Sequence, residues 1–132
     1  VYFIYGMYHC LNTVTGGPSN GEAVLIRAAE PIAGISAMIR HRSLRRPPRP
    51  GDLTGGPGKL CQAMAVDRSF DGQSLRVGSL TITRGEPDSV TEIVTGPRIG
   101  IDYAAEAVAW PLRFAEAGNR HVSRPFPWSN RD

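Results

Sequence analysis

The stretch that decides the fold is residues 1–15, which read VYFIYGMYHCLNTVT. It is rich in β-branched and aromatic residues, the composition typical of strands, and Gly6 interrupts it near the middle. A tight connection at Tyr5-Gly6 predicts a β-hairpin, with one strand over residues 1–5 and a second over 7–15. Such an aromatic hairpin can belong to the core, or its tip can insert into a flat partner, and both uses are open at this point.

Beyond the hairpin, turn residues alternate with short apolar runs. The glycine-rich turn at 16–21 is expected to lead into a strand over 22–29. Apolar residues at helical spacing predict an amphipathic helix over 33–44, which the proline-rich linker at 46–50 ends. Pro57 suits the first turn of another short helix.

The second half of the chain gives weaker signals. It predicts a second hairpin with strands at 75–77 and 80–83, a strand or loop at 90–94, a short helix over 102–110 capped by Asp102, and a final strand over 112–114. The proline-rich tail over 123–132 is expected to be loose. Together these elements predict an α+β fold, a single mixed domain over 1–122 built mainly on an antiparallel curved sheet with a protruding β-hairpin and short helices.

Length and composition restrict the class of protein. A chain of 132 residues fits one domain, and 41% hydrophobic with 20% charged residues is ordinary for a globular protein. No apolar run reaches the length of a membrane span, and the start lacks the basic region and cleavage signal of a secretory peptide. We therefore expect neither a membrane protein nor a secreted one. A first strand that begins at Val1 without a lead-in suggests further sequence upstream.

The sequence shows no pattern for a metal site or for a catalytic nucleophile. The three histidines are scattered, Cys10 and Cys61 lie far apart, and no Gly-x-Ser-x-Gly motif is present. We expect no metal and no cofactor. Both cysteines stand in apolar surroundings, which favours buried, reduced thiols.

Positive charge gathers in one short run. The net charge is only +3, yet Arg40, His41, Arg42, Arg45, Arg46 and Arg49 crowd together. Arginine suits bidentate contacts with phosphate and stacking on bases. A high-GC genome would produce the same excess of arginine over lysine without any functional meaning, so two explanations stay open.

A second candidate for anion binding is the glycine-rich stretch over 55–60, which leads into the expected short helix. Exposed backbone N–H groups and Lys59 at a helix start would attract an anion. The stretch is not a Walker A loop, because no Ser or Thr follows the lysine and no clean strand precedes it. A glycine-rich entry to a helix, with no ligand, is the alternative.

Four blocks of sequence resemble the alkyladenine (3-methyladenine) DNA glycosylase family. They are YFIYGMY at 2–8 with Asn12 beyond it, VLIRAAEP at 24–31, GPGKLCQA at 56–63, and RIGI at 98–101 followed by WPLRF at 110–114. The blocks occur in family order and cover almost the whole chain up to Ser123. The resemblance implies hydrolysis of the N-glycosidic bond of alkylated purines in double-stranded DNA, without a metal or a covalent intermediate. It also implies a monomer that works in the bacterial cytoplasm at the nucleoid, or in a eukaryotic nucleus.

The resemblance implies roles for the aromatic hairpin. Tyr5 matches the tyrosine that enters the minor groove and fills the gap left by a flipped nucleotide, with Met7 and Tyr8 beside it. Tyr2 matches an aromatic that stacks on the extruded base. Asn12 matches a pocket amide that disfavours the exocyclic amine of guanine.

Three further positions match residues that contact the backbone or the attacking water. Arg27 matches an arginine near the phosphate of the abasic site and the water, and Ile99 matches a residue whose backbone carbonyl holds that water. Lys59 is expected to contact a backbone phosphate.

In the family, the glutamate that activates water lies upstream of this hairpin, and no residue of the chain can be assigned its role. Three readings follow: an N-terminally truncated enzyme that binds lesions but has lost most turnover, an inactive DNA-binding remnant, or a small basic module for RNA or single strands.

Overall fold

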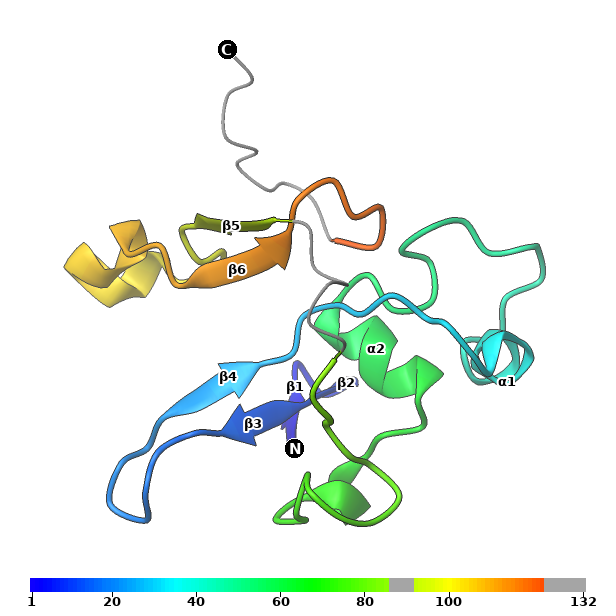
Figure 1. Ribbon diagram of the computed structural model, residues 1–132, viewed down its shortest axis with the longest axis horizontal. Coiled ribbons are helices and arrows are strands. Elements are labelled where there is room, and N and C mark those ends of the chain that lie inside the picture. The colour runs from blue at the N-terminus through cyan, green and yellow to red at the C-terminus, as the bar shows by residue number, and fades with distance from the viewer. Residues whose placement is uncertain (86–91, 123–132) are drawn as a thin grey trace.

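The N-terminal hairpin forms as the sequence predicts in the computed structural model, which describes residues 1–85 and 92–122. Strand β1 (Tyr2–Ile4) pairs antiparallel with β2 (Tyr8–Cys10), and Tyr2 lies opposite Cys10 (Figure 1). The Met7 N–H donates to the Ile4 carbonyl at 3.2 Å, which closes a turn over Tyr5 and Gly6. Both turn residues have positive φ, 54° and 66°, as a tight hairpin turn of the primed kind requires.

The prediction of one strand over 7–15 is wrong at Leu11. There the chain leaves the first ladder, and β3 (Asn12–Val14) pairs antiparallel with β4 (Ala23–Leu25) in a second one. The physical reason is that Cys10 and Leu11 are both buried, at 4% and 6% exposure. Neighbouring residues of a regular strand point to opposite faces, so burying both in one core requires the strand to break.

Two short helices lie beside these ladders. Helix α1 (Ile35–His41) is shorter than the predicted 33–44, because Gly34 precedes it with a φ of 70° and Ser43 has a φ of 51° just after its end. Helix α2 (Pro57–Ala63) begins at Pro57 as predicted. Helix α2 contacts both β2 and α1, so β2, α2 and α1 form a row (Figure 1).

The core is small and centred on α2. Leu60 and Cys61 of α2 pack with Leu11 and with Val66, which follows the helix. Phe70, at the end of the 3-10 turn η1 (Arg68–Phe70), and Leu80 pack against this cluster from outside. The core therefore fixes the break at Leu11, from which the hairpin projects.

A third ladder lies apart from the first two in Figure 1. Strand β5 (Ile93–Gly96) pairs antiparallel with β6 (Arg113–Glu116), with η3 (Asp102–Ala109) between them in sequence. The predicted helix over 102–110 with Asp102 as its cap is wrong. The segment consists of 3-10 turns broken by a kink at Ala105, where φ is 48°, and Ile101 occupies the cap position without any side-chain cap bond.

The predicted second hairpin, at 75–77 and 80–83, is also wrong. Neither range forms a strand, and a single bond from the Ile82 N–H to the Leu75 carbonyl, 2.8 Å long, joins them. Val77 is exposed and Leu80 packs onto the core, so the segment has no continuous buried face that would hold a ladder. Positions 90–91 of the expected strand or loop at 90–94, and the tail over 123–132, lie outside the described residues.

The α+β class and the antiparallel pairing of the strands are confirmed. In the described part of the chain, no helix is long and apolar enough to cross a membrane.

Candidate nucleic-acid interface

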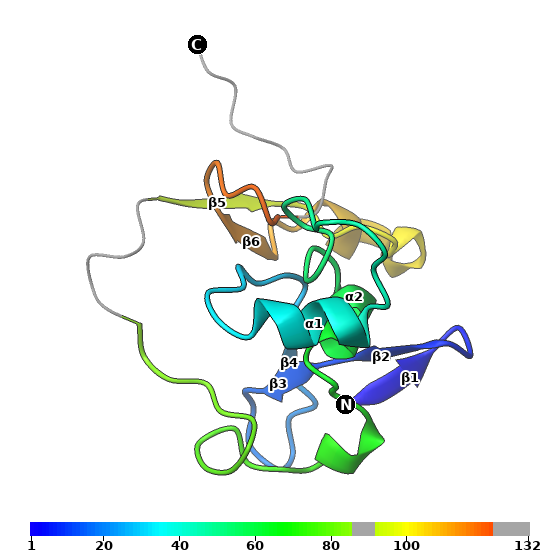
Figure 2. The same ribbon diagram turned by 90° about the vertical axis from the view of Figure 1, so that its right-hand side faces the viewer.

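The most exposed part of the aromatic hairpin is its tip. The side chain of Tyr5 is 82% exposed and that of Met7 is 63% exposed. Figure 2 shows the hairpin of β1 and β2 projecting beyond the rest of the described chain on its side. A planar ring on a two-residue turn can enter a narrow space, such as the gap between two stacked bases.

The base of the hairpin is held by α2. A Cβ atom placed on Gly58 would lie only 2.9 Å from the Tyr8 ring, so the ring rests directly against the backbone of the helix. Tyr8 still keeps 46% of its surface exposed. On the other face of the hairpin, the rings of Phe3 and His9 meet at a centroid distance of 4.9 Å. These contacts stiffen the hairpin without covering its tip.

Tyr2 and Arg27 come together where the first two ladders meet, and Asn12 begins the second ladder. Asn12 lies opposite Leu25, and the Ile26 N–H donates to the Leu11 carbonyl at 3.0 Å. Arg27, the next residue, lies close enough to Tyr2 for its charge to act on the Tyr2 hydroxyl. Two of the predicted site residues, Tyr2 and Arg27, are thus neighbours, although they are far apart in sequence.

Electrostatics support this neighbourhood. Burial and the Cys10 thiol raise the pKa of the Tyr2 hydroxyl, while the positive charge of Arg27 acts in the opposite direction. The Arg27 Nε atom is buried and has no hydrogen-bond partner among the described residues. A buried, unsatisfied guanidinium nitrogen is costly, and a bound anion would satisfy it.

Sequence reasoning assigned no role to two further arginines. Arg113 is only 5% exposed at the start of β6. Burial of its guanidinium and, to a lesser extent, the positive charge of Arg27 both lower the pKa of Arg113. Arg98 is half-buried, and its Nε atom has no partner in the described part of the chain. The sequence feature that marks them is that both arginines stand among apolar residues. A charged side chain is rarely buried in such surroundings unless it has a partner.

The remaining predicted residues lie elsewhere. Ile99 sits partly exposed in the bend between β5 and η3, beside Arg98. Lys59 is exposed in the first turn of α2, and its Nζ reaches the Gly51 carbonyl at 3.4 Å. The glycine-rich entry to α2 has a packing role, since a Cβ on Gly55 would lie 2.6 Å from the Gly51 oxygen.

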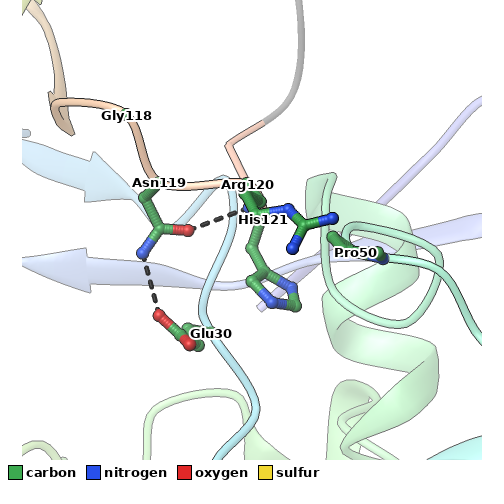
Figure 3. Close-up of a pocket in the computed structure, with 6 residues that line it drawn as sticks. All are labelled: Glu30, Pro50, Gly118, Asn119, Arg120 and His121. Atoms are coloured by element: carbon green, nitrogen blue, oxygen red, sulfur yellow. Dashed lines mark hydrogen bonds between the residues drawn. The ribbon is translucent and has the colours of Figure 1, made fainter.

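A cleft of about 300 Å³ lies apart from the hairpin tip, lined by Glu30, Pro50 and residues 118–121 (Figure 3). Asn119 Nδ2 donates to Glu30 Oε2 at 2.9 Å and to Glu116 Oε2 at 2.8 Å. Asn119 Oδ1 accepts from the His121 N–H at 2.9 Å. These polar groups of the cleft therefore already satisfy one another. Among the described residues, no group of three His, Cys, Asp or Glu side chains could hold a metal ion.

Comparison with known proteins gives the family. The family model of methylpurine-DNA glycosylase matches residues 1–120, nearly the whole chain. The chain belongs to the methylpurine-DNA glycosylase family. The match confirms the likeness to 3-methyladenine DNA glycosylases that the four sequence blocks indicate.

Curated members of the methylpurine-DNA glycosylase family are similar over almost all of this chain. Proteins named "Putative 3-methyladenine DNA glycosylase" from Desulfitobacterium hafniense, Myxococcus xanthus and Methanocella arvoryzae are 42%, 38% and 43% identical to it. The alignments cover 93%, 99% and 96% of this chain, but 63%, 61% and 62% of the relatives. The chain therefore spans about three fifths of the length of these relatives.

Proposed function

We propose that the protein is a base-excision DNA glycosylase that flips alkylated purines out of duplex DNA and removes them by hydrolysis. The observation that carries the proposal is the Tyr5 ring, 82% exposed on the turn of a hairpin that α2 holds in place. Inserting this ring between base pairs would replace the stacking lost when a nucleotide leaves the helix. Met7 and Tyr8 would flank the inserted ring, Tyr8 through its exposed part.

We assign Tyr2 and Asn12 to contact with the displaced base. Tyr2 offers a ring for stacking, and the Asn12 amide can distinguish purines by the groups on their edge. The Arg27 guanidinium lies close enough to Tyr2 to affect its ionisation, which suits contact with the phosphate of the flipped nucleotide. Lys59, exposed on α2, would bind another phosphate.

The reaction consists of attack by water on the sugar carbon that carries the damaged base. Arg27 and the Ile99 carbonyl are the groups we assign to positioning that water. Neither Glu22, exposed in the turn between β3 and β4, nor Glu30, bonded to Asn119, is placed as its general base. General-base catalysis contributes about a hundred- to ten-thousand-fold. With neither glutamate placed as the general base, we expect lesion binding by these 132 residues but no detectable base release.

The test compares binding of the chain to three probes: a duplex with ethenoadenine, a duplex with an abasic site, and an undamaged single strand. Preference for both damaged duplexes is expected. Equal binding to all three would contradict the proposal and favour a general nucleic-acid-binding module. Robust base release by the purified chain would show that a general base is present among its residues.

As a DNA repair enzyme of this kind, the protein would act as a monomer at the nucleoid or in a nucleus.

A further inference from the structure

The arginine run around α1 has no part in the proposed lesion site. Residues 31–66 carry six basic side chains and a single acidic one, Asp52. Their net charge of +5 exceeds that of the whole chain, +3, so the rest of the chain is slightly acidic. An excess of this size in a quarter of the chain is a local electrostatic feature and not a general basic bias.

The structure divides these cations into two groups. His41 Nδ1 lies 2.8 Å from the Ala63 carbonyl oxygen, Arg42 bonds to Gln62, and Arg46 forms an ion pair with Asp52 at 2.7 Å. These three side chains connect α1 and the following loop to the rest of the chain. By contrast, three exposed guanidinium groups have no partner within the described residues: those of Arg40, Arg45 and Arg49.

The segment that carries these three arginines lies on the side from which the hairpin projects. In Figure 2, α1 runs with its C-terminal end toward the side of the hairpin tip, and the loop that follows it continues there. Helix α2 separates α1 from β2 in the row described above. With about 10 Å between adjacent packed elements, α1, which carries Arg40, lies roughly 20 Å from the hairpin. That distance corresponds to about six base pairs at 3.4 Å per step.

We propose that Arg40, Arg45 and Arg49 form a second DNA-contact surface, which binds backbone phosphates of the duplex about six base pairs away from the nucleotide displaced by Tyr5. This inference rests on the proposed function, because Tyr5 fixes where the duplex lies. A duplex is stiff over about 150 base pairs, so one held at the hairpin must continue in a straight path past neighbouring elements. A flexible single strand is under no such constraint, which is why we assign duplex DNA to this surface.

The test uses the triple substitution Arg40→Gln, Arg45→Gln and Arg49→Gln in the full chain. Binding is measured over a range of salt concentrations to ethenoadenine duplexes with flanks of about 10 base pairs, one helical turn, or of about 3 base pairs. On long flanks we expect roughly tenfold weaker binding and a salt slope smaller by about three, one for each lost phosphate contact. On short flanks we expect no change.

The matched control carries Arg68→Gln, Arg76→Gln and Arg84→Gln, which remove the same charge from exposed arginines outside the α1 region. The control is expected to keep most of the salt slope. A variant with lysine at the same three positions keeps the positive charge and should also keep most of the salt slope. This variant distinguishes loss of charge from a disturbed fold as the cause of weaker binding. Because the three test arginines have no partner in the described part of the chain, the thermal midpoint should stay the same.

The proposed surface would be wrong if the triple variant kept the full salt slope, or if it lost as much affinity for duplexes with short flanks as for those with long flanks. It would also be wrong if the control variant lost as much affinity as the test variant, or if the three arginines strengthened binding to single strands as much as to duplexes. A different pattern would reject the proposed function alone. If the arginines strengthen binding to long duplexes but damaged and undamaged DNA bind equally, the surface stands and lesion recognition fails.

Discussion

At the scale of single residues, Tyr5 combines a highly exposed side chain with an unusual backbone conformation. Its φ of 54° lies in the left-handed region, which costs a residue with a side chain about 1–2 kcal/mol relative to its ordinary conformations. Glycine would adopt this turn without that cost. A large ring held there, 82% exposed, adds little to the core, which is consistent with the contact to DNA that we propose for it.

We expect Tyr5→Ala to weaken binding to a lesion duplex by about 1–3 kcal/mol, because one stacked aromatic ring is lost. Tyr5→Phe keeps the ring and should bind nearly as well as the natural sequence. Both variants can be compared by fluorescence anisotropy with an ethenoadenine duplex and its undamaged counterpart. Unchanged affinity of the alanine variant would remove Tyr5 from the proposed interface.

Residue types also show where sequence reasoning succeeds and where it ends. The exposure of Tyr5 follows from its place beside Gly6 in a tight turn, which is local information. The burial of Arg98 and Arg113 depends on contacts between segments that are distant in sequence, and no local pattern reports those contacts. The meeting of Tyr2 with Arg27 likewise depends on the break at Leu11, which follows from packing beneath α2.

At the scale of secondary-structure elements, the joint between the hairpin and α2 determines where the tip points. We expect Gly58→Ala to destabilise the fold by about 1 kcal/mol. The added methyl group would lie 2.9 Å from the Tyr8 ring and 3.2 Å from its Cβ, so β2 itself must move. Overpacking costs about 1–3 kcal/mol, which exceeds the gain of under about 1 kcal/mol from alanine near a helix start.

Gly56→Ala is the matched control, since the nearest atom to its added Cβ is Lys59 Cδ at 3.9 Å. Chemical denaturation of the two variants measures the difference in the free energy of unfolding. Lesion binding should fall for Gly58→Ala only, because only that substitution shifts the hairpin. Equal stability of the two variants would show that the hairpin tolerates displacement from α2.

The loop between α1 and α2 is expected to weaken in acid. The Arg49 N–H and the Arg46 guanidinium, both bonded to Asp52 Oδ2, hold the pKa of Asp52 below its ordinary value. A lowered pKa means that Asp52 stabilises the folded state fully above its unfolded value, about 3.9, and that this contribution is lost as pH falls through the folded value. Asp52→Asn should therefore flatten the dependence of stability on pH in that acidic range. A denaturation series across pH, run on both proteins, checks this; parallel curves would contradict it.

At the scale of the whole molecule, the third ladder and η3 carry exposed apolar side chains. Ile93 of β5, Phe114 of β6 and Tyr103 of η3 are 54%, 65% and 87% exposed. Apolar side chains exposed together on neighbouring elements favour association with other surfaces.

Binding of DNA should raise the free energy of unfolding of the chain. At a hundredfold excess of DNA over its dissociation constant, linkage adds about 2.7 kcal/mol to the free energy of unfolding. We expect lesion duplex to raise the thermal midpoint by several degrees, and undamaged duplex at the same concentration to raise it less. A thermal shift series with both duplexes tests this, with Tyr5→Ala as the variant in which the two shifts become equal.

The rate at which the buried cysteines react with thiol reagents reports how often the protein opens locally. Cys10 and Cys61, at 4% and 1% exposure, lie at the joint between the hairpin and α2, and burial raises the pKa of the Cys61 thiol. Thiol reagents react with the ionised form, so labelling should proceed only as fast as this joint opens. A duplex that binds the hairpin should slow the labelling. An equal labelling rate with and without DNA would mean that binding does not stabilise this joint. The labelling half-time would then report how firmly the hairpin is held against α2 when duplex DNA is present.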